Sequence, residues 1–546
     1  MRELGVTGRF LLLPCSRQAN YRHLLLKDEE GQVVDQIHAQ LCPPEQQEYV
    51  TLVHTQEFAD RGMRLTLTAD NRVSQFAKPQ GESADEAQLA LQESWPYYAE
   101  TVEAYHEPQR PLAHFTSLRG WINDANGPIW VDGVYHLYYQ YEPGNLMGIW
   151  DNSEWGHATS TDLYHWREEE PVLRYPCASS GSAWIRRETG RPCIAYKGRI
   201  YESRDGGYHY ELLTEHPEVG GDPKIFYHEE SGRYVCFALN GPDAYKISVS
   251  PDLFHWEETS VLRGFHECPD IVRLRVDGDG EEKWVLISGD MSYIFGRFDG
   301  RQLIPEPIEP DRADRFVPVH GNSAAMQAIQ DRYNGCTANA ALADDWSRFF
   351  AYAFQTFAHQ PDGRTLRIGW LDYQANALGA AFTECQSVVQ ELSLRTTRYG
   401  VRLCAMPARE IANGYEGEAV AVGAGERVRM TCPAADITAR FPVDSTLEIA
   451  GFRMAYDREA QELCIAREAL PDFRIPYPLQ PGEHGIRVRM IRDRGSAEIF
   501  FGDGEIYAPQ RVRELNDTWE AAAGDGAEIT VQPLGSLFAQ HPDWIR

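Results

Sequence analysis

The sequence feature that most constrains the fold is a short motif that occurs twice, ninety residues apart. Ser160-Thr-Asp-Leu-Tyr-His-Trp166 recurs as Ser250-Pro-Asp-Leu-Phe-His-Trp256, and a degenerate copy occupies residues 203–210. Around these copies, short apolar runs are broken by Gly, Asp and Pro, and few helical periods occur. Repeated β units with equivalent turns are typical of propeller blades, each of which packs on its neighbours. We therefore predict an all-β propeller in which this motif is a structural turn.

The length of the chain indicates more than one domain. At roughly 150 residues per domain, 546 residues predict three or four. Residues 1–105 contain runs that are typical of the strands of a small β-sandwich-like domain, at 9–13, 21–27, 32–41, 48–54 and 64–68. The polar stretch 81–87 indicates a loop or the start of a short helix. We predict the propeller over 106–400 and, from the alternation that follows, a C-terminal β-sandwich over 401–546.

Charge restricts the partners of the protein. With 52 basic and 81 acidic residues, the formal net charge is −29, which argues against nucleic acid or an anionic membrane surface as a partner. We expect the N-terminal domain to have a packing or interaction role, homo-oligomer formation included, because its sequence shows no chemistry.

The cysteines and the first residues indicate a compartment. Eleven cysteines, an odd number, show no Cys-x-x-Cys pair and no Cys/His cluster at metal-ligand spacing, so we expect buried free thiols in a reducing environment. Phe10-Leu-Leu-Leu-Pro14 is too short for the apolar core of a signal peptide. No run of about 18 apolar residues is present. We therefore expect a cytoplasmic protein.

Three carboxylic residues occupy similar settings, each in a loop or turn beside a strand. Asp124 lies in Trp121-Ile-Asn-Asp-Ala-Asn-Gly127, which leads into a strand, an Asp-Gly turn and a second strand. Asp222 lies in Gly220-Gly-Asp-Pro-Lys224, and Glu267 lies in His266-Glu-Cys-Pro-Asp270. Each alone is more typical of a turn residue than of a catalyst. Together they predict convergence, because strands that start near the axis of a propeller can bring side chains from different blades into one funnel.

These motifs identify the chain as similar to a known family. It resembles glycoside hydrolase family 32, the β-fructosidase family of invertases, inulinases and levanases, from about residue 112 to 510. The motifs that carry the resemblance are Trp121–Gly127, Tyr135-His-Leu-Tyr-Tyr-Gln140, Trp155-Gly-His-Ala-Thr-Ser160, Glu267-Cys-Pro-Asp270, Ile368-Gly-Trp370 and Val389-Gln-Glu-Leu392. The first hundred residues lie outside it. The resemblance implies a five-bladed β-propeller followed by a β-sandwich.

The resemblance also implies an activity, the retaining hydrolysis of terminal β-D-fructofuranosyl residues through a fructosyl-enzyme intermediate. Asp124 is the implied nucleophile, Glu267 the acid/base and Asp222 the transition-state stabiliser. The implied sugar contacts are Trp121, Asn123, Gln140, Trp150, Ser179 and Ser180. No metal or organic cofactor is implied. A retaining pair needs carboxyls about 5–5.5 Å apart, and at that distance mutual repulsion is expected to raise one pKa and so provide the proton donor.

Three departures from the family pattern leave alternatives open. Ala125 replaces the usual Pro after the nucleophile, Ser179 replaces a Phe, and Gly221 replaces the Arg expected before Asp222. The last departure affects substrate choice most. A fructosyltransferase of the same family and a non-catalytic fructan-binding protein are therefore the alternatives. Retention of all three acids opposes the second of these, since a binding protein needs no proton donor opposite a nucleophile.

Overall fold

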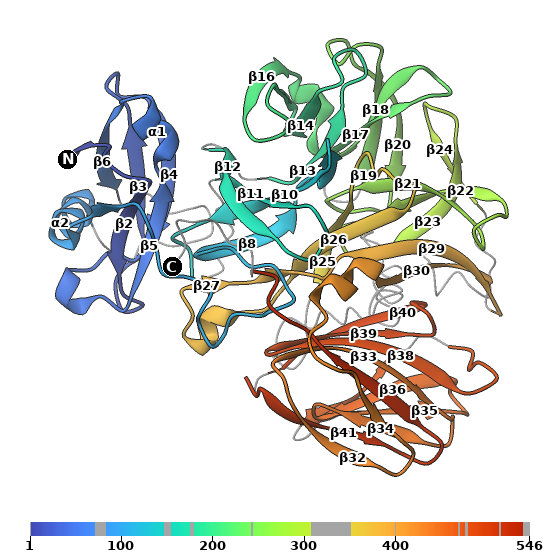
Figure 1. The fold of residues 1–546 in the computed structure, drawn as a ribbon. Helices are drawn as coiled ribbons and strands as arrows, with labels where there is room; N and C mark the ends of the chain where they lie inside the picture. The colour runs from blue at the N-terminus through green and yellow to red at the C-terminus, as the bar shows by residue number, and fades with distance from the viewer. Residues whose placement is uncertain are drawn as a thin grey trace.

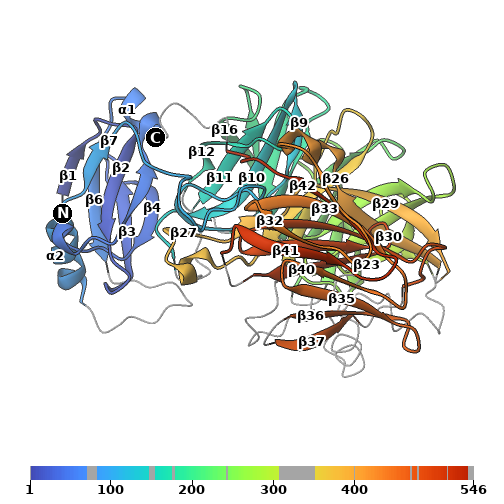
Figure 2. The same cartoon turned by 60° about the horizontal axis from the view of Figure 1, so that its bottom comes forward.

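The fold is known from a computed structural model that describes residues 2–70, 83–146, 154–174, 179–241, 244–306, 351–398, 400–467, 470–475, 479–512 and 515–538. Strands dominate it, as the sequence predicts, and they form an N-terminal body, a central propeller and a C-terminal body (Figure 1). Figure 2 shows the N-terminal sheets at the side of the propeller. Within the described ranges, no helix combines the length and the apolar composition needed to cross a membrane.

The N-terminal body is a sandwich of two antiparallel sheets. One sheet has the order β1-β6-β3-β4 and the other the order β5-β2-β7. Their strands are β1 (Arg2–Gly5), β2 (Phe10–Cys15), β3 (Arg22–Lys27), β4 (Val33–Ala39), β5 (Tyr49–His54), β6 (Arg64–Asp70) and β7 (Tyr97–Ala99). The five predicted strands correspond to β2 to β6. The short α1 (Gln56–Asp60) and the longer α2 (Ala84–Ser94) complete it, and α2 begins with a capping box between Ser83 and Glu86.

The propeller has five blades, as the family resemblance predicts. The first contains β8 (Gly120–Ala125), β10 (Val134–Glu142), β11 (Glu154–Ser160) and β12 (Arg167–Leu173), with β9 (Ile129–Val131) and β27 (Phe382–Thr383) added. The second contains β13 (Gly181–Ile185), β14 (Pro192–Tyr196), β15 (Arg199–Ser203) and β16 (Tyr210–Glu215), and the third β17 (Gly221–His228), β18 (Arg233–Leu239), β19 (Ala244–Ser250) and β20 (Glu257–Arg263). The fourth contains β21 (Asp270–Arg275), β22 (Glu282–Ile287), β23 (Tyr293–Phe298) and β24 (Leu303–Pro305), and the fifth β25 (Ala351–Thr356), β26 (Thr365–Leu371), β29 (Gln390–Thr397) and β30 (Gly400–Pro407), with β28 (Cys385–Gln386) added.

The repeated sequence motif is a structural turn, as predicted. In its first copy the Ser160 hydroxyl accepts from the backbone N–H of Leu163 at 2.8 Å, and Asp162 accepts from the N–H of His165 at 2.8 Å. The His165 ring pairs with the same carboxylate at 2.7 Å. The copies at 203–210 and 250–256 repeat these contacts. In each of three blades the motif joins the third strand to the fourth, so it fixes the blade edge.

The C-terminal body is a second sandwich of two antiparallel sheets, with orders β31-β42-β33-β38-β39-β40 and β32-β41-β34-β35-β36-β37. Its strands are β31 (Val420–Val422), β32 (Arg427–Thr431), β33 (Ala434–Phe441), β34 (Thr446–Ile449), β35 (Phe452–Asp457), β36 (Glu462–Arg467), β37 (Leu470–Ile475), β38 (Ile486–Asp493), β39 (Ser496–Phe501), β40 (Ile506–Arg511), β41 (Thr518–Ala523) and β42 (Glu528–Pro533). Because β30 pairs with β29 along its whole length, the fifth blade continues to Pro407, seven residues past the predicted boundary at 400.

Candidate active site

The predicted acids meet at one end of the propeller, where β13, β17, β21 and β25 start and where β8 ends. Asp124 lies near the end of β8, Ser180 directly precedes β13, and Asp222 is the second residue of β17. Glu267 lies three residues before β21, and Tyr352 is the second residue of β25. Five blades therefore each place a polar side chain at the same end, as the topology of a propeller requires.

Asp124 is held by donors from three blades. Its Oδ2 accepts from the Ser180 hydroxyl at 2.6 Å and from Gln140 Nε2 at 3.1 Å. The Cys268 thiol reaches the same oxygen at 3.4 Å, and Asn123 Nδ2 lies 3.4 Å from Oδ1. Asp124 is only 5% exposed, so these contacts fix its orientation.

The other two acids lie next to Asp124 through Cys268. Asp222 Oδ2 accepts from the backbone N–H of Cys268 at 3.3 Å, and Oδ1 accepts from the Ser179 hydroxyl at 3.4 Å. Glu267 precedes Cys268, and its Oε2 accepts from the Tyr352 hydroxyl at 3.0 Å. The side chain of Glu267 is 42% exposed, whereas Asp222 is 9% exposed. The structure thus brings together all three predicted acids, with Glu267 the most accessible.

The backbone around the acids adopts a conformation that side chains rarely take. Asp222, Glu267 and Cys268 have φ angles of 44°, 47° and 44°. Each such residue costs on the order of 1 kcal/mol or more, and these outliers cluster where function fixes the geometry. Two donors hold the strained turn: the Tyr245 hydroxyl at 2.6 Å and the N–H of Gly289 at 3.2 Å, both to the carbonyl of Glu267.

Burial and mutual repulsion set the electrostatics of the acids. Burial raises the pKa of Asp124 to about 7, the charges of Asp222 and Glu267 add to the rise, and the Ser180 hydrogen bond opposes it. Burial and the charge of Glu267 raise the pKa of Asp222 to about 6. The sequence predicts that repulsion within the retaining pair raises a pKa. In the structure, burial is the larger cause, and it raises the pKa of the predicted nucleophile and of the predicted stabiliser.

The predicted sugar contacts divide into two groups. Gln140, Ser179 and Ser180 touch the carboxyls of Asp124 or Asp222 directly. Trp121 is 2% exposed and Asn123 is fully buried, so neither lies on an open surface, and Asn123 contacts Asp124. Trp150 lies outside the described residues.

Two residues next to the acids make contacts that the sequence does not predict. The sequence predicts only that the cysteines are buried free thiols, and Cys268 does pack with Tyr352, Ala353 and Trp370, but it also contacts both Asp124 and Asp222. The sequence predicts no role for Tyr352, the donor to Glu267. The adjacency of Cys268 to Glu267 in the sequence was the available signal for the first. Nothing in the sequence linked residues 267 and 352, which lie 85 positions apart.

Gly221, at the position of the missing arginine, has space for a side chain. A Cβ at Gly221 would contact only the side chain of Leu239, at 3.6 Å and 3.8 Å, which is ordinary packing. Another arginine, Arg204, does not replace the missing charge. Arg204 pairs with Glu211 at 3.4 Å and lines a pocket of about 190 Å³ with Asp132 and Gly190, in turns at the opposite end of the blades. Lys197, in the β14–β15 turn, is a cation whose charge lowers the pKa of Asp222.

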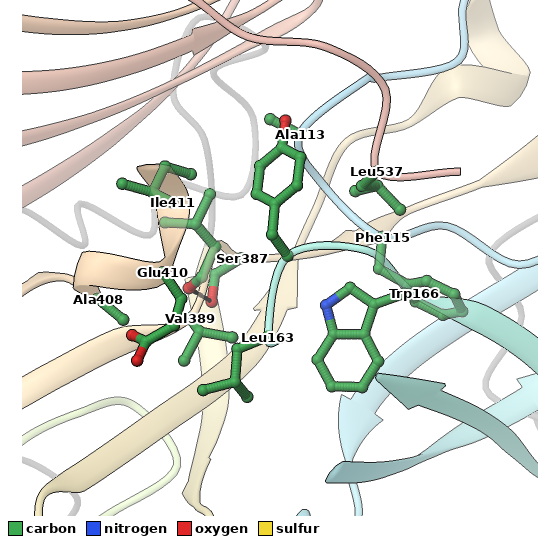
Figure 3. Close-up of a pocket in the computed structure, with 12 residues that line it drawn as sticks. Ala113, Phe115, Leu163, Trp166, Ser387, Val389, Ala408, Glu410, Ile411 and Leu537 are labelled. Atoms are coloured by element: carbon green, nitrogen blue, oxygen red, sulfur yellow. Dashed lines mark hydrogen bonds between the residues drawn. The ribbon is translucent and has the colours of Figure 1, made fainter. Parts of the chain in front are cut away.

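A cavity elsewhere in the molecule is too small for a sugar. It lies at the junction of the propeller with the chain's C-terminal return, where Phe115, Trp166, Val389 and Leu537 surround it (Figure 3). Its volume of about 20 Å³ accommodates roughly one water molecule. Among the described residues, no group of three His, Cys, Asp or Glu side chains is arranged to hold a metal ion.

Carboxylic side chains gathered at one end of a five-bladed propeller, with one exposed and two buried, define a glycosidase that works with carboxyl groups. Residues 114–407, more than half of the chain, match the family described as "Glycosyl hydrolases family 32 N-terminal domain". The chain therefore belongs to glycoside hydrolase family 32.

Relatives of known name agree with this assignment. The chain is 27% identical to a levanase of Bacillus subtilis (strain 168) over 526 residues, covering 80% of this chain and 72% of the relative. It is 25% identical to an extracellular exo-inulinase of Aspergillus ficuum over 534 residues, covering 76% of this chain and 92% of the relative. The crystal structure of an exo-inulinase from Aspergillus awamori superimposes with a TM-score of 0.63 at 21% identity, covering 79% of this chain and 99% of that one.

Proposed function

We propose that the protein releases terminal β-D-fructofuranosyl residues from sucrose or short fructo-oligosaccharides, with net retention of configuration. The observation that carries the proposal is the acid cluster: Cys268 touches Asp124 and Asp222, and Glu267 directly precedes it in the chain. A levanase and exo-inulinases among the relatives support a fructose-containing substrate.

The proposed mechanism assigns one task to each acid. Ionised Asp124 attacks the anomeric carbon while Glu267 gives its proton to the departing glycosidic oxygen. A water molecule then attacks the fructosyl-enzyme ester, and Glu267 takes the proton of that water, so both carboxyls return to their starting states. Asp222 stabilises the positive charge that develops on the fructosyl ring. Ser180 and Gln140 hold the nucleophile in place for both steps.

The stereochemistry of the first product tests this function. Hydrolysis of sucrose followed by NMR should show β-fructose before mutarotation, because double displacement inverts the anomeric carbon twice. Asp124→Asn is the matched control and should show no release. α-Fructose as the first product would exclude the proposed pair of steps, and release of no fructose from any fructoside would support a fructan-binding role instead.

We also propose a cytoplasmic location and homo-oligomer formation through the N-terminal domain. The nine cysteines in the described ranges are all free, and eight of them are buried, which fits a reducing compartment. Light scattering of the full chain and of Tyr97→Glu, which puts a charge at an exposed position of the N-terminal domain, tests the oligomer. The same mass for both proteins would exclude the surface around Tyr97 as the oligomer interface.

A further inference from the structure

The first blade extends beyond the acids at the end where they lie. The innermost strands of the second, third and fourth blades begin at Gly181, Gly221 and Asp270, next to the acids. In contrast, β8 begins four residues before Asp124. Its first residues pair with the last residues of β10, Ile122 with Tyr141 and Trp121 with Glu142. This extension is where the N-terminal sandwich docks (Figure 1).

His38 of the sandwich holds the end of β10. Its backbone N–H donates to Glu142 Oε1 at 3.0 Å, and its Nδ1 lies 3.2 Å from Oε2. Both side chains are almost completely buried, at 3% and 0% exposure. Glu142 is two residues from Gln140, which touches both Asp124 and Ser180. One contact therefore links the N-terminal domain to the hydrogen-bond partners of the nucleophile.

The chain that follows Glu142 is enclosed by the same domain. The Thr51 hydroxyl donates to the carbonyl of Pro143. A Cβ on Gly144 would lie 1.7 Å from the carbonyl oxygen of His38, so only glycine permits this approach. Leu146 is buried in the hydrophobic core of the sandwich together with Leu11 and Ile37. Pro143, Gly144 and Leu146 of the first blade thus depend on the N-terminal domain for their packing.

A second anchor holds the start of β11. Arg174, at the end of β12, donates to Asp35 of the sandwich at 2.9 Å and to Glu154 at 3.1 Å. Its guanidinium also lies 5.0 Å from the centre of the Phe58 ring. Asp35 and Glu154 are 1% and 2% exposed. Breaking a buried, shared ion pair is strongly destabilising locally, because it leaves a charge without its partner.

We propose that the N-terminal sandwich is part of substrate recognition: His38 and the Asp35–Arg174 pair are positioning residues that fix the extension of the first blade, and this extension sets affinity for the sugar units beyond the terminal fructosyl residue. The inference rests on the proposed function for the identity of the ligand. In this proposal the acids bind the terminal unit, and the further units lie along the extension. Loosening the anchors therefore affects long substrates more than short ones.

Kinetics on two substrates test the proposal. In Arg174→Met, kcat/KM for a tetrasaccharide fructo-oligosaccharide should fall about tenfold more than kcat/KM for sucrose, mostly through KM. Arg187→Met is the matched control, since Arg187 is an exposed arginine of the propeller that pairs with Glu229, and both substrates should be unaffected. Equal proportional losses on the two substrates in Arg174→Met would overturn the proposal. Asp35→Asn, which keeps the shape of the side chain, decides the question if Arg174→Met does not fold.

Two readouts do not depend on turnover. Measured in the Asp124→Asn background, which does not consume the ligand, calorimetric affinity for the tetrasaccharide should fall about tenfold when Arg174→Met or Asp35→Asn is added and stay unchanged when Arg187→Met is added. Hydrogen exchange of peptides covering residues 120–125 and 139–146 should become faster in the anchor variants alone. If neither peptide exchanges faster in the anchor variants, the proposal is overturned. Absence of fructose release by the unaltered protein would instead refute the proposed function, while these two readouts still report on the anchors.

Discussion

Asp124→Asn should stabilise the folded protein above neutral pH while it removes turnover. The carboxyl is 5% exposed, and its burial, with the nearby charges of Asp222 and Glu267, raises its pKa from 3.8 to about 7. Such a group is retained for chemistry and not for stability, since ionising it in the folded state works against its surroundings. Asparagine has nearly the same shape and cannot ionise.

The size of the effect follows from proton linkage. A carboxyl whose pKa is higher in the folded chain binds more protons when folded, so stability falls as pH rises between the two pKa values. At about 1.4 kcal/mol per pH unit, the rise from 3.8 to about 7 corresponds to at most about 4 kcal/mol, lost in full above pH 7 and not at all well below pH 4. Between pH 5 and pH 8, the advantage of Asp124→Asn over the unaltered protein should therefore grow by about 2–3 kcal/mol.

Thermal unfolding at these two pH values measures the difference. The melting temperature of Asp124→Asn minus that of the unaltered protein should be higher at pH 8 than at pH 5 by on the order of 5 °C for a domain of this size. Asp132→Asn is the control, because Asp132 is exposed in the β9–β10 turn and its φ of 47° suits asparagine. A melting difference that is the same at both pH values, or a variant less stable than the parent at pH 8, would refute the reasoning.

Three further results are expected from activity measurements. The value of kcat/KM should fall as pH drops below about 7, since protonation of Asp124 removes the nucleophile, and a pH profile that is flat down to pH 5 would contradict this. Ser180→Ala should move that acid limb to higher pH and lower kcat/KM by roughly tenfold, more than Cys268→Ala, because a 2.6 Å hydroxyl bond to a carboxylate is stronger than a 3.4 Å thiol contact. Glu267→Ala should lose far less on an activated fructoside than on sucrose in the first step, and equal losses would reassign the acid/base.

The fold could be predicted closely because its signals are local. Alternation and turn residues located β2 to β6 within two residues at each end. The repeated motif located the blade edges, since its side chains bond to their own backbone within four residues. The helix α2 was predicted only as a loop or the start of a short helix, although Ser83 and Glu86 have the spacing of a capping box.

The site could be predicted only in part because its contacts are long-range. The three acids followed from family motifs, but the raised pKa values of Asp124 and Asp222 depend on burial, which the sequence does not display. Tyr352 and Glu267 meet because two blades are adjacent. The docking of His38 on Glu142 joins residues 104 positions apart in different domains, and no periodicity records it. The strained turn at Glu267 and Cys268 likewise depends on Tyr245 in β19 and on Gly289 in the β22–β23 turn.

The Gly221 departure leads to a last prediction, in which one charge is restored. The position has space, since its Cβ would meet only Leu239, and its backbone needs no positive φ. A guanidinium beside Asp222 should favour the carboxylates and lower the raised pKa values of Asp222 and Asp124. Because the acid limb of kcat/KM reports protonation of Asp124, Gly221→Arg should move this limb to lower pH by roughly half to one unit. Gly221→Gln, which adds similar length without charge, should leave the limb in place. Identical limbs in the two variants would mean that the side chain at 221 does not act on the acids through charge, and that Lys197 already provides what the site requires.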